Sequence, residues 1–517
     1  MRQLKYALIV AGAVSGVPYA VLATPSDDTL VVGLSADIDT LDPGEISSRD
    51  ASNVAEHIFT TLSSISVDGQ VTPRLADTYT VSDDGKSLTY HIPPGHTCQD
   101  GETLDAEDVA YSFNRAADPA NKFTGNTPGF IFTSIDFKDA IAPDPEHVVI
   151  NVGIKSSMTP GFLTEVFVHC KDSYEKMSLD DATTHPVASG PYQVVDWTPG
   201  SEIVLEKRQD PGNFKTIEYR IIPEASTRTA ELLTGNVDII TNVSPDQIGA
   251  IDNSNVARVE KVQGTRRMYV GFNQSAMFDS PGAMAIKKAD VRRALQYAVD
   301  VPTICQQLLS IECERATSLV NPPQGNPDLT PYPYDPAMAE KLLDEAGYPR
   351  DADGVRFEMT LQAPRGRYLN DANVALAVGQ YLSDIGVATN VELMEWSSVY
   401  VPLIRKHEAG PMFFLGSGGG LWSALYDMSD LAAVDSGPNY TDWDDPRWFS
   451  RWADIEAAKS PEEERTIINE MLKVFHDDGP WLLMYFQPDF YGVSNRIDWT
   501  ARRDEVVELF DAKLAAK

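Results

Sequence analysis

A strand, a helix and a second strand follow one another between residues 357 and 393. Phe357 to Leu361 alternate apolar and polar side chains, which predicts a strand with one wet face. A helix is predicted from Asp371 to Gly386, and Val387 to Leu393 predict a further strand directly after it. This order of elements places helices against a sheet, so we expect an α/β fold with mixed sheets.

The same patterns recur along the chain. Strands are predicted at Leu88–Ile92 and Ile217–Ile221, and helices from Asp290 to Ala298 and from Asp335 to Gly347. The 517 residues are too many for one compact core, and neither an internal repeat nor a long low-complexity linker divides them. We therefore expect at least two lobes, joined by short strands.

The first residues predict an export signal. Arg2 and Lys5 precede an apolar run, Tyr6 to Val21, and small residues up to Ala23 form a cleavage site. A membrane anchor is the alternative, but glycines, a serine and a proline interrupt a run that is short for a span. No cysteine follows the cleavage site to carry a lipid. We expect a free periplasmic protein whose mature chain begins at residue 24.

The charge of the chain limits its partners. It carries 42 basic and 76 acidic residues, a net charge of −34 at pH 7. Such a surface repels nucleic-acid phosphates and anionic lipid, so neither a nucleic acid nor a membrane surface is an expected partner.

Four cysteines make an even count for an oxidising compartment, so two disulfides are predicted. Three pairings are possible. We favour Cys305 with Cys313, which are close in sequence, and Cys98 with Cys170. Four buried free thiols are the alternative.

The common enzyme motifs are absent from the sequence. The eight histidines are scattered, no HExxH or other metal-ligand spacing occurs, and there is neither a GxSxG nucleophile elbow nor a P-loop. We expect no catalytic residue, no metal and no cofactor. An exported hydrolase remains the alternative of another class, and a chaperone or structural adaptor is a third.

The stretch RLADTYTVSDDGKSLTYHIPPGHTCQDGETLDAEDVAYSFNR, from Arg74 to Arg115, has a clear local design. Asp83 to Lys86 and Asp100-Gly101 predict two turns, and Asp105 with Asp108 can cap the helix that follows. These features stabilise turns and a helix, so their role is structural. They identify a family without themselves touching a ligand.

This stretch resembles the extracellular solute-binding proteins that serve peptide, nickel and opine ABC importers. Three further stretches resemble the same family, in the family's order: SGPYQVVDWTPGSEIVLEKR from Ser189, ADVRRALQYAVD from Ala289 and YDPAMAEKLLDEAGY from Tyr334. The resemblance implies a two-lobed periplasmic-binding-protein clamp with an extra α+β subdomain inserted in lobe one. It implies lobe one at 24–72, 186–264 and 484–517, the subdomain at 73–185 and lobe two at 265–483, with hinges near 266–273 and 484–490.

The implied function is that of a periplasmic substrate-binding receptor. It would capture a small organic solute, peptide-like, opine-like or a modified amino acid, between its lobes and deliver it to the inner-membrane ABC permease. We expect a monomer. A short oligosaccharide or a cationic compound is the alternative solute.

The resemblance also nominates solute-binding residues, segment by segment. In lobe one, LDPGEISSRDASN gives Ser48 and Arg49, DIITNVSPDQ gives Asn242, and the crossing strand VQGTRRMYVGFN gives Arg266, with Arg267 pointing to the other side. In lobe two, APRGRYLNDA gives Arg367 and Tyr368, and ELMEWSSVY gives Trp396.

Each nomination has a plainer alternative. The arginines can be solvated surface charges, and the tryptophan can be core packing. If Arg49, Arg266 and Arg367 converge, their guanidinium groups favour an anionic or zwitterionic solute.

The run GSGGGLWSALYD, from Gly416 to Asp427, resembles a Gly-Trp-x-x-Asp motif whose acid pairs with a peptide's amino terminus. Here glycines replace that tryptophan and Trp422 stands near the place of the acid, so the amine-binding pair is lost unless a re-routed loop brings in Asp427. We expect Gly418 and Gly419 to widen the pocket, with Trp422 offering a flat face. Close approach of two backbones is the alternative. An ordinary linear peptide is then a less expected solute.

Overall fold

The computed structural model describes residues 25–516 apart from 39, 67–68, 157, 314, 323, 419–422 and 435–436. The predicted signal peptide, residues 1–23, therefore lies outside the described residues. So do Gly419 and Trp422 of the glycine run.

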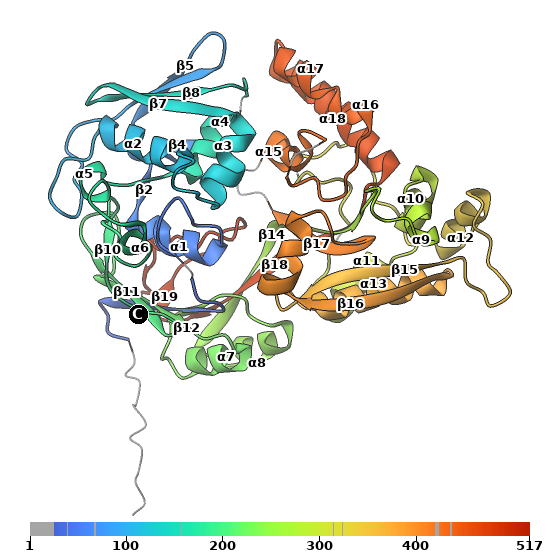
Figure 1. The fold of residues 1–517 in the computed structure, drawn as a ribbon. Coiled ribbons are helices and arrows are strands. Elements are labelled where there is room, and N and C mark those ends of the chain that lie inside the picture. The colour runs from blue at the N-terminus through green and yellow to red at the C-terminus, as the bar shows by residue number, and fades with distance from the viewer. Residues whose placement is uncertain are drawn as a thin grey trace, which may run out of the picture.

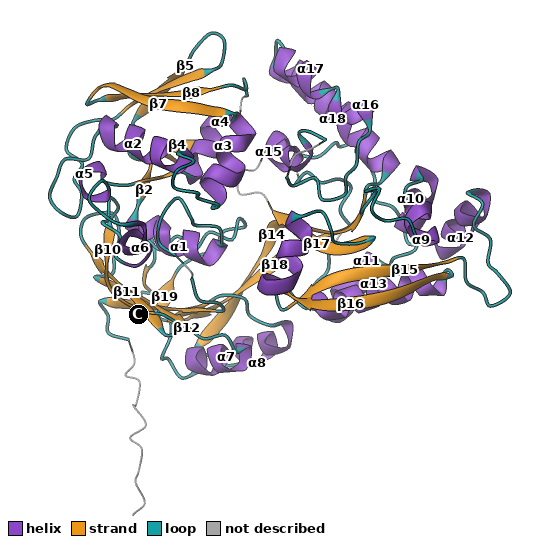
Figure 2. Cartoon of the chain, in the orientation of Figure 1, coloured by secondary structure: helices purple, strands orange, loops and turns teal. Residues whose placement is uncertain are grey.

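One ten-stranded mixed sheet forms the frame of the molecule (Figure 2). Two long antiparallel strands, β14 (Ala257–Phe272) and β18 (Trp481–Ser494), lie in its middle. On one side, after β18, follow β13 (Ile239–Ile240), β1 (Thr29–Leu34), β12 (Thr216–Ile221), β11 (Glu202–Lys207) and β10 (Tyr192–Thr198). On the other, after β14, follow β17 (Met412–Gly418), β15 (Phe357–Arg365) and β16 (Val387–Glu395).

The pairing of β14 with β18 is interrupted partway along. Its register shifts between Gln263 and Arg267, and again between Arg267 and Tyr269. The two halves of the sheet therefore share two strands whose ladder is irregular between the halves.

The larger core covers the β17-β15-β16 side, and we call this part lobe two. Its helices are α9 (Pro281–Ile286), α10 (Ala289–Gln296), α11 (Val301–Ile304), η4 (Cys305–Leu309), α12 (Pro336–Glu345), α13 (Asp371–Asp384), η5 (Trp396–Tyr400), α14 (Val401–Arg405), α15 (Ala424–Met428), η6 (Ser429–Leu431), α16 (Pro446–Phe449), α17 (Trp452–Ala457) and α18 (Pro461–Asp478). Most of its helices lie on the right of Figure 1, whereas α15 lies beside the inserted subdomain.

The β10 to β13 side carries two cores, and we call it lobe one. Its helices are α1 (Arg49–Ile58), α7 (Ala225–Leu233), η3 (Pro245–Gln247) and α8 (Ile248–Asp252), and its small strand pair is β19 (Ile497–Asp498) with β20 (Lys513–Leu514). Buried His57 of α1 accepts a hydrogen bond at Nε2 from the backbone of Leu509 (3.2 Å). This contact holds the C-terminal segment against α1.

A separate core lies within the inserted subdomain, above lobe one in Figure 1. Its sheet consists of β5 (Thr78–Val81), β6 (Ser87–His91), β8 (His147–Val152) and β7 (Phe137–Asp144). Two short strand pairs lie where the chain passes from lobe one into the subdomain: β2 (Thr60–Thr61) with β9 (Phe167–Val168), and β3 (Ser63–Ile65) with β4 (Val71–Pro73). Its helices are α2 (Ala106–Ala117), η1 (Thr127–Ile131), α3 (Phe132–Ile135), α4 (Thr159–Phe162), η2 (Leu163–Glu165), α5 (Lys171–Tyr174) and α6 (Leu179–Thr184).

Local sequence patterns account for several of these elements. The strands predicted at 88–92, 217–221 and 357–361 are confirmed as β6, β12 and β15, and α13 leads into β16 as expected. Asp335 caps α12 by accepting a hydrogen bond from the backbone of Met338 (2.9 Å). The predicted capping box of α2 is present, with Asp105 and Asp108 as its two members.

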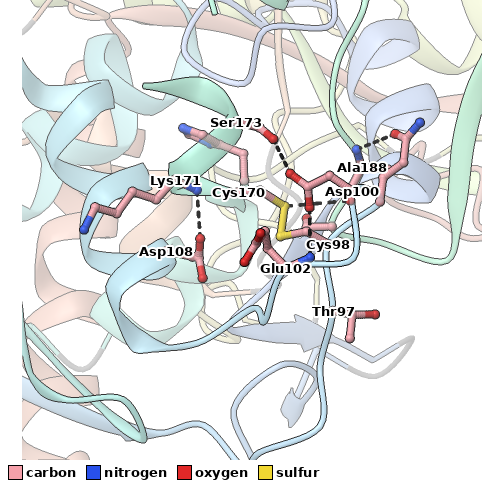
Figure 3. The surroundings of a disulfide bond; sticks show 12 residues. Thr97, Cys98, Asp100, Glu102, Asp108, Cys170, Lys171, Ser173 and Ala188 are labelled. Carbon is pink, nitrogen blue, oxygen red and sulfur yellow. Dashed lines mark hydrogen bonds between the residues drawn. A yellow bond between two sulfur atoms is a disulfide. The ribbon is translucent and has the colours of Figure 1, made fainter. Parts of the chain in front are cut away.

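Both favoured disulfides are confirmed, Cys98 with Cys170 and Cys305 with Cys313. Figure 3 shows the first of them among polar contacts that tie the same two segments together. The carboxylate of Asp108 accepts a hydrogen bond from the backbone of Lys171 (2.8 Å), next to Cys170. The cystine therefore reinforces a contact that hydrogen bonds already make.

Candidate functional site

The first turn of α1 points its charged residues toward the boundary between the lobes. Ser48 is the N-cap, and its Oγ accepts a hydrogen bond from the backbone of Ala51 (3.1 Å). Asn53 connects the helix to the C-terminal segment, because its Nδ2 donates a hydrogen bond to the backbone oxygen of Glu505 (3.1 Å). Ser48 thus acts on the helix, and the helix places Arg49 and Asp50.

Arg266 and Arg267 leave β14 on opposite faces, as strand alternation predicts. Arg267 is buried in lobe two, where it donates to Asp427 Oδ1 (2.8 Å) and Asp430 Oδ2 (2.7 Å). Arg266 instead forms two hydrogen bonds to Glu505. Its Nε donates to Oε1 and its Nη2 donates to Oε2, each over 2.7 Å. Burial would raise the pKa of Glu505, but this pairing lowers it to about 2.

The engagement of Arg266 changes its expected role. Both arms of its guanidinium fork are occupied by Glu505, a partner that the sequence did not suggest. Arg266 therefore positions the C-terminal loop at the lobe boundary.

An aromatic wall lies on lobe two. Asp371 fixes the loop before α13, because its Oδ2 accepts from the backbone N–H groups of Arg367 (2.8 Å) and Tyr368 (3.0 Å). The ring centroids of Tyr368 and Trp396 lie 5.7 Å apart at 71°. Cζ of Arg367 lies 5.1 Å from the Tyr368 centroid and 5.4 Å from that of Trp396. The structure thus brings these three nominated residues together.

Arg367 has no anionic contact. Among the described residues, it makes no side-chain hydrogen bond or ion pair, although it is half-buried. Burial lowers its pKa, and the charge of Arg266 lowers it further. A desolvated guanidinium held only by aromatic faces is ready to bind an anion.

Asp50 of lobe one interacts electrostatically with Arg367. Burial raises the pKa of Asp50 to about 6, and the charge that most opposes this rise is that of Arg367. An acid of lobe one and a base of lobe two therefore interact across the boundary.

Two described glycines of the run have definite neighbours. A Cβ on Gly416 would lie 2.7 Å from Met268 Sδ and 2.9 Å from Tyr368 Cε1, and a Cβ on Gly418 would lie 3.2 Å from Arg266 Cα. Close approach of neighbouring atoms thus accounts for both, and the space beside them is filled by Tyr368 and Arg266. Pocket widening at Gly419 and a flat face from Trp422 concern residues that the structure does not describe.

Asp427 does not take over the amine-binding role. It is buried, and besides its bond to Arg267 its Oδ2 accepts from the backbone N–H (2.8 Å) and Nδ2 (3.1 Å) of Asn321. Asp427 therefore has a structural role, because it joins Arg267 and Asn321 inside lobe two.

Asn242 makes its side-chain hydrogen bond within lobe one. It adopts a left-handed φ of 54° after β13, and its Nδ2 donates to Ser35 Oγ (2.7 Å). Its exposed side chain contacts neither Arg49 nor Arg367 in the described part of the chain.

Sequence reasoning missed four acids at the boundary: Asp50, Glu165, Asp489 and Glu505. Asp50 directly follows the nominated Arg49 in the sequence. No sequence feature pointed to the other three acids. Burial raises the pKa of Asp489 well above its usual range, and Glu505 raises it further. Its Oδ2 is buried without a hydrogen-bond partner among the described residues.

Two structural features are absent from the described residues. No group of three or more His, Cys, Asp or Glu residues there is arranged to hold a metal ion. No helix in the same part of the chain has the length and apolar character needed to span a bilayer.

Two lobes that share two central strands, with opposed charges and an aromatic wall at their boundary, define a solute-binding clamp. The chain belongs to the bacterial extracellular solute-binding proteins, family 5, whose middle-region model matches residues 70–438. It is the solute-binding component of an ABC importer.

Known proteins similar to this chain agree with that assignment. The glutathione-binding protein GsiB of Salmonella paratyphi A is 25% identical over 88% of each chain. The structure of DppA from Helicobacter pylori with the peptide STSA has a TM-score of 0.79 at 20% identity, covering 94% of this chain and 98% of that one. The structure of AgaA from A. tumefaciens R10 with agropinic acid has a TM-score of 0.80 at 23% identity, covering 95% and 99%. At these identities the solved structures show the shared fold.

Proposed function

We propose that this protein captures a small organic solute bearing a carboxylate between its two lobes and delivers it to the inner-membrane permease. The observation that carries the proposal is the guanidinium of Arg367, which is half-buried on an aromatic wall and has no anionic contact among the described residues. A guanidinium binds a carboxylate through two parallel hydrogen bonds, and Tyr368 and Trp396 hold the fork in place.

The opposite wall favours a zwitterion. Asp50 of lobe one interacts electrostatically with Arg367, and a solute ammonium beside Asp50 would stabilise its charged form. Relatives named for glutathione, a peptide and agropinic acid support a peptide-like, opine-like or modified amino acid solute. A neutral oligosaccharide would leave the half-buried guanidinium of Arg367 without an anion, which disfavours that alternative.

Several further points are part of the proposal. The chain is exported, with cleavage near Ala23, acts in the periplasm as a monomer and carries out no catalysis. Lobe one comprises residues 24–72, 186–264 and 484–517, the inserted subdomain 73–185 and lobe two 265–483. The interrupted pairing of β14 with β18 supports a hinge between the lobes.

A ligand screen followed by titration tests this function. Di- and tripeptides, opines, betaines and oligosaccharides are compared by thermal shift, and the stabilising compound is titrated calorimetrically. Arg367→Gln should weaken its binding by at least about tenfold, the effect of losing a charge-assisted hydrogen bond. Arg365→Gln is the matched control, because Arg365 is exposed on the same segment, and should leave binding unchanged.

Three results would contradict the proposal. One is tight binding of a neutral saccharide that Arg367→Gln does not affect. Another is an unchanged radius of gyration in small-angle scattering at saturating solute, because a clamp becomes more compact as it closes. The third is repeated release of a chemically altered product.

A further inference from the structure

A small cavity lies behind the first turn of α1. Its volume is about 80 Å³, and it is bounded by α1, by η2 of the inserted subdomain and by the C-terminal loop around Asp504. A single water needs only about 10–15 Å³ measured in this way, so the cavity holds a group of several heavy atoms. Ile131 and Phe167 contribute apolar walls.

Two charged side chains of opposite sign line this cavity without meeting. Arg49 comes from lobe one and Glu165 from the subdomain. Within the described residues, neither makes a side-chain hydrogen bond or ion pair. Burial raises the pKa of Glu165, and the charge of Arg49 is the main effect that opposes the rise. The two groups therefore influence each other across the cavity.

The remaining charges of the cavity wall are paired. Arg502 donates Nη2 to Asp504 Oδ2 (2.5 Å), and Glu56 pairs with Arg74. Arg49 on α1 and Glu165 on η2 are thus the two charged side chains of the cavity wall that have no ion-pair partner among the described residues. A bound phosphate would lie beside Glu165, and a bound metal cation would lie beside Arg49, so either simple ion meets a like charge.

We infer that this cavity binds the α-amino acid head of the solute, with its carboxylate on Arg49 and its ammonium on Glu165. The inference rests on the proposed function, because the solute enters from the lobe boundary at which Arg49 stands. The head has five heavy atoms, which suits the cavity, and it presents both charges that the wall lacks. The solute class is then an amino acid whose remaining part carries a second carboxylate to Arg367.

A tyrosine of lobe two contacts the inserted subdomain that carries Glu165. Tyr426 of α15 packs against Phe162 and Phe130 of the subdomain, with ring centroids 5.1 and 5.7 Å apart. The same tyrosine interacts electrostatically with Arg49 and Glu165. Tyr426 therefore links lobe two to the two charges of the subsite.

The probes that test the subsite are L-alanine, N-acetyl-L-alanine and L-alanine amide. Each blocked form lacks one of the two charges. Titration of the full protein at millimolar probe concentration should show binding of L-alanine, with each blocked form weaker by at least about tenfold.

The variants assign each charge to its partner. Glu165→Gln should remove the preference for L-alanine over N-acetyl-L-alanine, and Arg49→Gln should remove the preference over L-alanine amide. Glu165→Asp and Arg49→Lys keep the charges and should partly restore the two preferences. A variant that merely disturbs the fold would weaken all probes alike, so the selectivity separates a binding role from a structural one.

Two outcomes overturn the inference: no binding of L-alanine, or binding whose selectivity survives both Gln variants. They are distinguishable from failure of the proposed function. That function fails when Arg367→Gln leaves solute binding unchanged, and L-alanine binding in the cavity does not depend on Arg367.

Discussion

Arg266 and Glu505 form a two-point ion pair, with Nε to Oε1 and Nη2 to Oε2 distances of 2.7 Å each. The side chains are only 14% and 18% exposed, so either charge alone would be poorly solvated. Removing one partner of such a pair leaves an uncompensated charge, which costs about 3–5 kcal/mol when fully buried. We expect Glu505→Gln and Arg266→Met each to lower the free energy of unfolding by about 3 kcal/mol.

Urea denaturation of both single variants and the double variant checks this coupling. The double variant should lose clearly less than the sum of the single losses. Asp252→Asn serves as control, because its ion pair with Lys261 is 39% and 49% exposed and contributes below about 1 kcal/mol. Additive losses at Arg266 and Glu505 would show that the pair does not act as a unit.

Asp50 predicts a pH-dependent stability. Its folded pKa is raised from 3.8 to about 6 by burial, so folding favours the protonated form. That contribution is complete below 3.8 and is lost as the pH rises through about 6. Asp50→Asn should therefore stabilise the ligand-free protein by about 1–3 kcal/mol at about pH 7.5, and by little at about pH 3.5.

Thermal melts across this pH range provide the measurement. Asp290→Asn is the matched control, because Asp290 is an exposed acid in the first turn of α10. A stability difference between wild type and Asp50→Asn that does not change with pH would contradict the prediction.

The two disulfides should differ in what they contribute to stability. Cys98 and Cys170 are 72 residues apart, whereas Cys305 and Cys313 are 8 apart. Chain-entropy arguments give about 4 kcal/mol for the longer loop and about 2.5 kcal/mol for the shorter. Replacing each pair by alanines and measuring denaturant unfolding tests this order. Equal losses would mean that loop entropy is not the main contribution, and free thiols in exported wild-type protein would show that the bonds do not form.

Tyr426 should stabilise the closed clamp. It is 7% exposed and belongs by packing to the subdomain core, although it lies on α15 of lobe two. Tyr426→Ala should weaken solute binding by about tenfold or more, mainly through faster release, because the closed form loses an aromatic contact across the lobes. Stopped-flow release kinetics measure the effect. Tyr334→Ala, at a tyrosine of lobe two that is 45% exposed, should not alter release; equal effects of the two variants would refute the role of Tyr426.

Much of the fold was accessible from the sequence because its signals are local. Asp335 before Pro336, and the alternation from Phe357 to Leu361, act within a few residues of themselves. The central pairing of β14 with β18 has no such signal. Those strands are more than 200 residues apart, and their interrupted register depends on tertiary packing.

The candidate site also has a part that could be predicted from the sequence and a part that could not. Arg367, Tyr368 and Trp396 were nominated from family resemblance, and the structure brings them together on one wall. Arg266 was expected to face the solute, and its ion pair with Glu505 was not predicted. The two residues are 239 positions apart in the sequence, and no local pattern near either one indicates the other. Charge pairing between distant segments was the part of the site that sequence patterns could not supply.

The central position of β18 also sets the order in which the molecule is completed. Its neighbours β13 and β14 belong to different halves of the sheet, and both precede it in the chain by more than 200 residues. Neither half can therefore close its hydrogen-bond ladder until the residues up to Ser494 have been synthesised. A chain that ends before Trp481 retains two open strand edges, so the native sheet forms only when nearly the whole chain is present.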